Sequence, residues 1–599
     1  MTADAGAAAG MRDVLDRYDT ALLRRVADNL LHSRLQRARG DLIEKMVEAA
    51  GNAAVIDRRL QALDGPKRGL LAILGLGRRA QWELSTVLEL LACLGAADGL
   101  LAAQELFEAG LLYPELPNGR AALHRFKDWL PSAPTNYRVF APPGVTSRAA
   151  GQAGKATGSR QQATDETKEG FGIPTVACCL LPVASASVRE SDGLEWFLRL
   201  GALWQEIHNQ PPRLTQQGAF FKRDHERFEA ATLLTAPAAD ELHRPPQLGH
   251  ALVSFGLACG LLERHEGQIV AGDFPQSWQD GAVAAITELW SLLPVMHSWN
   301  PGEGWRGLHA GPSPYASANL LAMALLAQLP ADAWASPQEV AECIAARHCF
   351  WPEPENGRGR SGSMAKRTHP LAAWADAFLL GVAYQIRLVQ AAQDGDGHWL
   401  VRLSTLGRSV LGLAPPPQAL AFPKTLLVQP NLEVLAYRQG LTPALIADLS
   451  RFASWQSLGP ACTLRLDPET VYRGLERGAS LEGIVRLLQQ HGVREPPPGV
   501  LESLKTWANK RERLTVYSGA TLLEFATAED AQAALSRGLP GLRLADRLVL
   551  VADEADIDFR HFRLTGTRDY ALPPGQCVEV GSDGVTLAVD PARSDLLLD

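Results

Sequence analysis

Three sets of basic residues are spaced so that their side chains could contact successive phosphates of a nucleic acid. The sets are Lys222, Arg223 and Arg227; Arg358, Arg360, Lys366 and Arg367; and Lys505, Lys510, Arg511 and Arg513. Solvated faces balanced by nearby Asp and Glu explain each set equally well, and for the Gly-rich loop 352–370, which holds the second set, a solvated surface is the commoner explanation. Trp507 and Tyr517 could stack on bases, although a core position is the better interpretation of both.

A motor that hydrolyses ATP needs a Gly-rich loop with Lys and Ser/Thr to hold phosphates and magnesium. The nearest candidate is the segment 149–157, Ala-Ala-Gly-Gln-Ala-Gly-Lys-Ala-Thr. Ala149 stands where the first glycine is required, and Ala156 stands where the hydroxyl is required. Asp553 and Glu554 follow an apolar strand-like run, but without a phosphate loop they are better explained as a helix start. The sequence therefore predicts no ATPase.

Metal and nucleophile motifs do not support an enzyme either. Cys343, His348, Cys349 and His369 fall in one region, but their spacing is not a usual zinc pattern. Core cysteines and a surface histidine explain them better. The chain holds no Gly-x-Ser-x-Gly motif. We expect no catalytic residues, no bound metal and no cofactor.

Composition sets further limits on the kind of protein. The chain has 599 residues and a formal net charge of −8, with 46% hydrophobic and 21% charged residues. This length predicts several domains. The negative net charge argues against a protein coated in nucleic acid by bulk attraction, but a local basic groove depends on where the charges lie.

The eight cysteines are scattered without a regular framework, which favours a reducing cytoplasm. The first ten residues lack a basic region followed by an apolar core, so they do not resemble a signal peptide. We find no uninterrupted apolar run of about 18 residues, the length needed to cross a membrane. We therefore expect a cytoplasmic protein with no membrane partner.

Helical periodicity followed by a Gly turn and two short strands occurs at three places, near residues 101–140, 252–271 and 378–403. This order is typical of winged-helix units. The irregular spacing argues against a solenoid of fixed period. A helical hairpin with a Gly cap is the alternative.

Composition shifts divide the chain. We expect a helical, winged-helix-like domain over 1–143, a flexible linker over 144–172 and a helical domain with winged-helix-like modules over 173–415. After Pro415-Pro-Pro the pattern changes to an α+β unit over 416–540, followed by a β-rich extension over 541–599. In the α+β unit we predict helices at about 442–452, 468–476, 480–490, 498–510 and 528–536.

The segment 427–437, Leu-Val-Gln-Pro-Asn-Leu-Glu-Val-Leu-Ala-Tyr, resembles the opening strands of the N-terminal domain of XPB-type DNA helicases and of bacterial helicase-associated proteins that carry this domain. The similarity continues through 445–452, 463–466, 471–478, 484–491 and 496–501, within a region of about 422–537. A weaker similarity, to a segment that precedes this domain in the bacterial proteins, covers Arg213 to Asp224.

Together, the element patterns and the resemblance predict a mostly α protein with small β-wings, in which an array of winged-helix-like modules precedes an α+β XPB N-terminal-like domain. Such a domain sits beside DNA-processing machinery, and in the helicases it has been linked to contacts with distorted DNA. The implied function is a non-motor, helicase-associated DNA-binding or DNA-processing accessory, with DNA and a helicase in trans as partners. A scaffold that docks onto a separate helicase or nuclease is the alternative, as is a winged-helix protein that acts like a transcription regulator.

Overall fold

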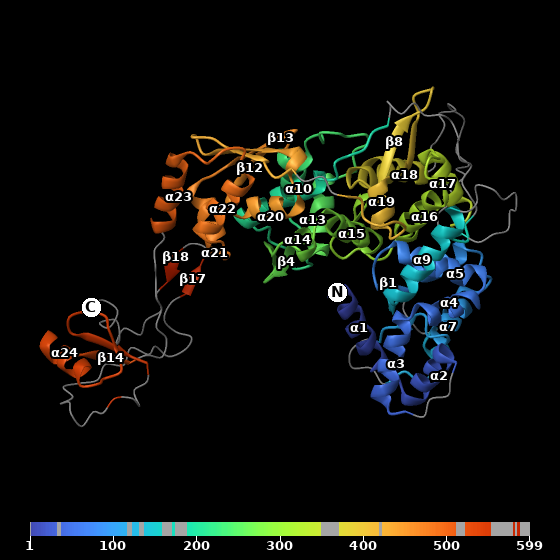
Figure 1. Ribbon diagram of the computed structural model, residues 1–599, viewed down its shortest axis with the longest axis horizontal. Coiled ribbons are helices and arrows are strands. Elements are labelled where there is room, and N and C mark those ends of the chain that lie inside the picture. The colour runs from blue at the N-terminus through green and yellow to red at the C-terminus, as the bar shows by residue number, and fades with distance from the viewer. Residues whose placement is uncertain are drawn as a thin grey trace. The chain divides into compact units, whose positions relative to one another are not determined.

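The computed structural model describes residues 2–32, 37–116, 122–130, 137–158, 170–173, 188–348, 370–418, 422–510, 521–552, 557, 579–581 and 584–586. The chain divides into two compact units, residues 1–511 and 512–599. Helices dominate, and the strands form small antiparallel sheets (Figure 1). The expectation of a mostly helical protein with small β elements is confirmed. In the part of the chain that the structure describes, no helix has the length and apolar character needed to cross a membrane.

The first unit opens with four helices that pack on one another. They are α1 (Thr2–Leu15), α2 (Thr20–Leu31), α3 (Arg39–Gly51) and α4 (Ala53–Gln61). Short polar side chains start two of them, because the carboxylate of Asp19 accepts a hydrogen bond from Ala21 N and Asn52 caps the first turn of α4. Their apolar stripes, such as Leu22, Leu23 and Val26 on α2, are buried.

Three segments of the described chain then share one order of elements: a helix, a short strand or single bridged residue, two or three helices, and a strand pair whose second strand pairs with that first strand or residue. In the first segment these are α5 (Gly65–Leu76), β1 (Gln81–Glu83), α6 (Leu84–Cys93), α7 (Gly99–Glu108), β2 (Tyr113–Pro114) and β3 (Arg138–Phe140), with α8 (Phe126–Trp129) before β3. The strand order is β1-β3-β2, and both pairs are antiparallel.

The second segment comprises α10 (Glu195–Asn209), a single bridged residue at Arg213, α11 (Lys222–Ala230), the short α12 (Thr232–Thr235), α13 (Leu248–Ala258), β4 (Leu262–His265) and β5 (Gln268–Ala271). Arg213 pairs with Gln268 of β5, which is the relation that β1 has to β3. After β5 the chain forms α14 (Gln276–Gln279), α15 (Ala282–Leu292), the 3-10 turn η4 (Leu293–Val295), β6 (Trp299–Asn300) and β7 (Gly304–Trp305).

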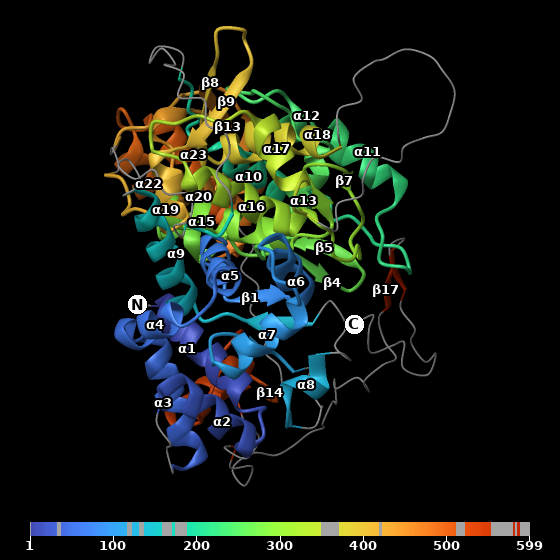
Figure 2. The ribbon, with the colours of Figure 1, turned by 90° about the vertical axis from the view of Figure 1, so that its right-hand side faces the viewer.

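The third segment comprises α16 (Tyr315–Gln328), a bridged residue at Ala335, α17 (Pro337–Ala345), α18 (Pro370–Asp376) with its π-helical continuation η5 (Ala377–Ala383), β8 (Val389–Gln393) and β9 (Trp399–Leu403). Ala335 pairs with Val401 of β9. The hairpin β8–β9 projects from the helices of this segment (Figures 1 and 2), and α19 (Thr405–Val410) follows it.

Residues 143–158, which lie mostly within the segment expected to be a flexible linker, form helix α9 (Pro143–Gly158) instead. The helix packs along α5 (Figure 2), and Val145, Ala149 and Ala150 are buried there. The small residues of this segment offer no large apolar side chain, but they allow two helices to approach closely. A Cβ atom added to Gly75 of α5 would lie 2.2 Å from the carbonyl oxygen of Thr146. Residues 159–169 of the expected linker lie outside the described residues.

The first unit ends with a four-stranded antiparallel sheet of order β10-β11-β13-β12 and helices that cover it. The elements are β10 (Leu426–Val428), β11 (Glu433–Tyr437), the turn η6 (Arg438–Gly440), α20 (Pro443–Phe452), β12 (Ser454–Ser457), β13 (Ala461–Arg465), α21 (Pro468–Glu476), α22 (Leu481–His491) and α23 (Pro498–Lys510). The helices predicted at about 442–452, 468–476, 480–490 and 498–510 are confirmed.

This sheet and its helices pack across α10 of the second segment. The side-chain amide of Gln205 donates to the carbonyl oxygens of Ser450 and Ala453, and its oxygen accepts from Trp455 N at 3.1 Å. Arg477 lies over the ring of Trp204, with its guanidinium carbon 4.8 Å from the ring centroid. Helix α10 therefore belongs to the core of the second segment and also carries the C-terminal sheet.

The second unit holds a sheet of order β14-β16-β15 with helix α24 against one face. Its elements are β14 (Thr521–Glu524), α24 (Ala528–Ser536), β15 (Leu542–Arg543) and β16 (Leu548–Val551), and a separate pair joins β17 (Glu579–Gly581) to β18 (Gly584–Thr586). The predicted helix at 528–536 is confirmed. Ala531, Val549 and Val551 form its small core.

Candidate nucleic-acid interface

Helix α11 begins directly after a tight hairpin formed by residues 213–221. Leu214 pairs with Phe220, and Thr215 N donates to the carbonyl oxygen of Ala219 at 2.8 Å. Gly218 at the turn has a φ of +73°, and a Cβ atom there would lie 2.5 Å from His309 Nε2, so the turn requires glycine. The hairpin buries Phe220 and leaves Phe221 exposed at the start of α11.

The basic residues predicted on this helix separate into two groups. Lys222 and Arg223 point into solvent, with side chains that are 90% and 72% exposed. Lys222 Nζ lies 3.6 Å from Glu226, and Arg223 Nε lies 3.8 Å from Asp224. Pairs of highly exposed cations at such distances are weak, so both cations remain available to a ligand. Arg227 instead lies inward, 3.6 Å from carboxylate oxygens of Glu206 and Asp224.

The hairpin also brings an exposed arginine beside the strands that follow α13. Arg213 pairs with Gln268 of β5, and Gln268 pairs with His265 of β4. Residues paired across antiparallel strands share a face of the sheet, so these three side chains form one polar row. Sequence reasoning quoted Arg213 only as part of a similarity. Its pairing with Gln268 arises between segments more than 50 residues apart, which no local pattern in the sequence reports.

A chain of hydrogen bonds joins α11 to α13. His250 of α13 is 1% exposed, and its Nδ1 lies 2.6 Å from Glu229 Oε1, which also accepts from His250 N at 3.2 Å. His250 Nε2 lies 2.6 Å from His225 Nδ1. His225 is partly exposed, and burial together with the neighbouring His250 lowers its pKa from the ordinary value of 6.5. Sequence reasoning missed these residues because His225 and Glu229 meet His250 only in the folded chain.

Helix α13 directly precedes the β4–β5 pair, and its surface is covered. All residues from Leu248 to Gly256 are buried. The π-helical segment η5 of the third segment is buried over its whole length as well. A helix reads bases only when its side chains enter the major groove. In this conformation the buried residues of α13 and η5 cannot do so.

Of the other predicted basic sets, the structure describes only Lys505 and the backbone of Lys510. Lys505 Nζ lies 3.2 Å from Glu502 on the exposed side of α23, and Lys510 ends the same helix. Arg511, Arg513, Arg358, Arg360, Lys366 and Arg367 lie outside the described residues. Trp507 packs partly buried against the core, in agreement with its expected core role, and Tyr517 lies outside the described residues.

The segment 149–157, considered above as a phosphate loop, lies inside helix α9. Ala149, Ala150 and Ala153 are buried there. A phosphate loop presents backbone N–H groups to the ligand, whereas the N–H groups in the middle of a helix are bonded to its own carbonyl groups. The segment therefore does not have the geometry of a phosphate-binding loop.

One serine and one histidine approach each other as a nucleophile and its base would. Ser317 Oγ lies 2.7 Å from His348 Nε2 and donates to Glu89 at 2.7 Å. Ser317 is fully buried, so a substrate cannot reach it, and burial lowers the pKa of His348 to about 4. The contact instead joins α6 to α16 and to the residues after α17. Cys343 lies on α17, while Cys349 and His369 are outside the described residues.

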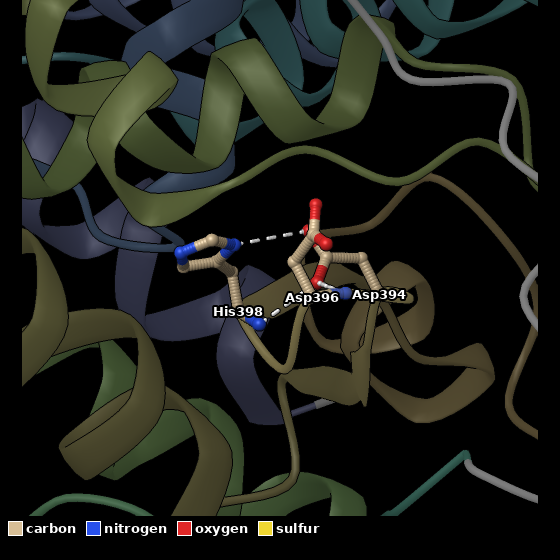
Figure 3. A group of neighbouring side chains, drawn as sticks. All are labelled: Asp394, Asp396 and His398. Atoms are coloured by element: carbon tan, nitrogen blue, oxygen red, sulfur yellow. Dashed lines mark hydrogen bonds and ion pairs between the residues drawn. The ribbon is translucent and has the colours of Figure 1, made fainter.

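The tip of the β8–β9 hairpin gathers Asp394, Asp396 and His398 (Figure 3), whose ligand atoms lie within 4.8 Å of one another. Asp394 Oδ1 accepts from Asp396 N at 2.9 Å and from His398 N at 2.8 Å. These backbone donors lower the pKa of the Asp394 carboxyl. The carboxylate therefore closes the turn, which is the usual role of Asp at such a position.

Comparison with known proteins adds no family to this description. No protein-family model matches the sequence, and no curated protein is significantly similar to it.

Proposed function

We propose that this protein is a non-motor accessory of DNA-processing machinery that holds duplex DNA by its phosphate backbone. The chain would consist of three winged-helix modules followed by an XPB N-terminal-like domain over 422–510 that continues into the second unit. The repeated order of elements, with the first short strand bound to the last strand, supports the winged-helix assignment. The sequence similarity at 427–501 supports the XPB-like assignment, and a helicase in trans is the protein partner that it implies.

The observation that carries the proposal is the exposed basic surface at the start of α11. Lys222 and Arg223 stand free of strong ion pairs, and Arg213 lies on the neighbouring strand row. Contacts to the DNA backbone position a protein on the duplex and carry no sequence information. Because α13 is covered, we propose backbone binding without base readout.

Fluorescence anisotropy with a labelled short duplex, titrated at several salt concentrations, tests this function. Reversal of charge in Lys222→Glu/Arg223→Glu removes two phosphate contacts, so the slope of log affinity against log salt should fall in magnitude by about 2. Lys45→Glu/Arg58→Glu is the control, since it changes net charge equally on α3 and α4, at the half-buried Lys45 and the exposed Arg58. Absence of binding at low salt, or equal losses in both double variants, would refute the proposal.

A protein scaffold is the second candidate, and helix α7 favours it. Leu100 and Leu101 are 42% and 51% exposed at its start, and its charged residues are Glu105 and Glu108. A surface of leucines and carboxylates suits a protein partner and repels phosphates. Leu101→Asp should abolish co-purification of such a partner from the native host and leave DNA binding intact. A partner retained by Leu101→Asp would remove this candidate.

A further inference from the structure

Glu229, His250 and His225 form a directional chain of hydrogen bonds. Glu229 and His225 are four residues apart, so they lie on one side of α11, and His250 reaches them from α13. Gly249 allows this approach, because a Cβ atom there would lie 2.2 Å from the carbonyl oxygen of Phe228. The crossing of the two helices therefore fixes His250 between Glu229 and His225.

The contacts determine which ring nitrogens carry protons. Glu229 accepts from His250 N and faces His250 Nδ1, so that nitrogen is the donor. His250 Nε2 is then an acceptor, and His225 Nδ1 must donate to it across 2.6 Å. Neutral His225 consequently keeps an unprotonated Nε2. A proton added at Nε2 leaves the whole chain intact, because His225 Nδ1 still donates to His250.

We propose that His225 is a further anion-binding residue of the α11 surface, which takes up one proton from solvent at Nε2 when a DNA phosphate binds beside Lys222. His225 lies three residues after Lys222, on the neighbouring turn of the same face. Glu229 and His250 are positioning residues that hold its ring. This inference rests on the proposed DNA-binding function and names a proton-linked contact within it.

The charges around His225 set the direction of the effect. From α11, Asp224 and Glu229 favour the cation, whereas His250 of α13 and burial oppose it, and burial is the largest influence. Phe220 and Trp305, the aromatic neighbours, bring no charge. The pKa of His225 consequently lies below 6.5, and the side chain is neutral at pH 7 without a ligand. A phosphate adds negative charge nearby and favours the proton, so affinity must rise as the pH falls.

The experiment measures duplex binding by the full chain from about pH 5.5 to about pH 8 at constant ionic strength. For one linked proton, affinity should rise by up to about tenfold per unit decrease in pH. His225→Gln should bind within about threefold of the native chain at the alkaline end and lose most of the pH dependence, because Gln can still donate to His250. Glu229→Gln should move the pH profile of DNA affinity to lower pH, because Glu229 favours the protonated form of His225. His398→Gln, an exposed histidine at the β8–β9 tip, should leave the profile unchanged.

Calorimetry of the native chain in two buffers with different ionisation enthalpies gives the proton count without any variant. Uptake of about one proton near pH 6.5 supports the proposal. Zero uptake, or a pH dependence that survives in His225→Gln and is lost in His265→Gln, overturns it. Absence of DNA binding at every pH refutes the proposed function itself, whereas binding that does not vary with pH refutes only the role of His225.

Discussion

The carboxylate of Glu195 accepts a hydrogen bond from Arg438 Nη2 at 2.6 Å, although the two residues are 243 positions apart in the chain. Glu195 also accepts from Arg199 Nε at 2.7 Å, and Asp192 lies on the other side of Arg438. Both residues of the Glu195–Arg438 pair are nearly fully buried. A buried carboxylate between two guanidinium groups joins α10 to the C-terminal sheet of the first unit.

Loss of Arg438 should therefore destabilise the first unit strongly. Arg438→Ala leaves the Glu195 carboxylate and Asp192 without their shared cation, and removal of one partner of a buried ion pair lowers the free energy of unfolding by about 3–5 kcal/mol. Urea denaturation of the native chain and of each variant measures this change in the free energy of unfolding. Lys505→Ala, which breaks the exposed pair with Glu502, is the control and should change stability by less than about 1 kcal/mol. Equal effects would show that the pair contributes no more than a surface contact.

The docking of α9 on α5 can be tested through two glycines. Gly75→Ala should destabilise the first unit by about 1–3 kcal/mol, because the added methyl group meets the Thr146 carbonyl oxygen at 2.2 Å. Gly151→Ala, on α9, has no atom within 4 Å of its Cβ and should stabilise that helix by up to about 1 kcal/mol. Thermal unfolding of the two variants and of the native chain measures both changes in stability. If Gly75→Ala is neutral, residues 143–158 do not pack on α5 as a helix.

Local patterns in the sequence were enough to locate most helices and the paired strands. The order of helix, Gly turn and strands near Leu101, Leu252 and Phe378 marked all three repeated segments, because turns and alternation are short-range features. Burial of a segment could not be predicted from these local patterns. Residues 144–158 contain few large apolar side chains, and their helix exists because a small-residue face meets Gly75 of a helix that lies about 70 positions earlier in the sequence.

The candidate site was likewise predicted only in part, because local patterns do not report contacts between distant segments. Lys222 and Arg223 are adjacent in sequence and exposed, as a basic run predicts. Arg227 follows the same run, but Glu206 from α10 turns it inward, and no local pattern reports a charge partner from another helix. The row from Arg213 to His265 and the contact of His225 with His250 arise from strand pairing and helix crossing. Both relations appear only after the chain has folded.

Stability should also depend on pH through His348. Its pKa is about 4 in the folded protein because of burial, compared with 6.5 for an unperturbed histidine. Between these values the unfolded chain binds one more proton than the folded chain, so this contribution is complete above about pH 6.5 and is lost as the pH falls towards 4. The loss is about 3 kcal/mol. Urea denaturation at several pH values should show a weaker acid dependence for His348→Gln than for the native chain, and an unchanged dependence for His398→Gln.

DNA recognition by this protein should be insensitive to base sequence. Every residue from Leu248 to Gly256 on α13 is buried, and η5 is buried throughout, so neither helix can place side chains in a major groove. Lys222 and Arg223 can reach phosphates, which are alike in all duplexes. Competition binding with short duplexes of unrelated sequence should give affinities within about threefold of one another, whereas specific recognition gives ratios of at least about a thousandfold. A strong preference for one duplex would mean that α13 becomes exposed on binding, and hydrogen exchange of its backbone with and without DNA would detect that opening directly.

Arg227→Ala should reduce stability while leaving the salt dependence of DNA binding unchanged, because Arg227 faces Glu206 and Asp224 instead of the ligand.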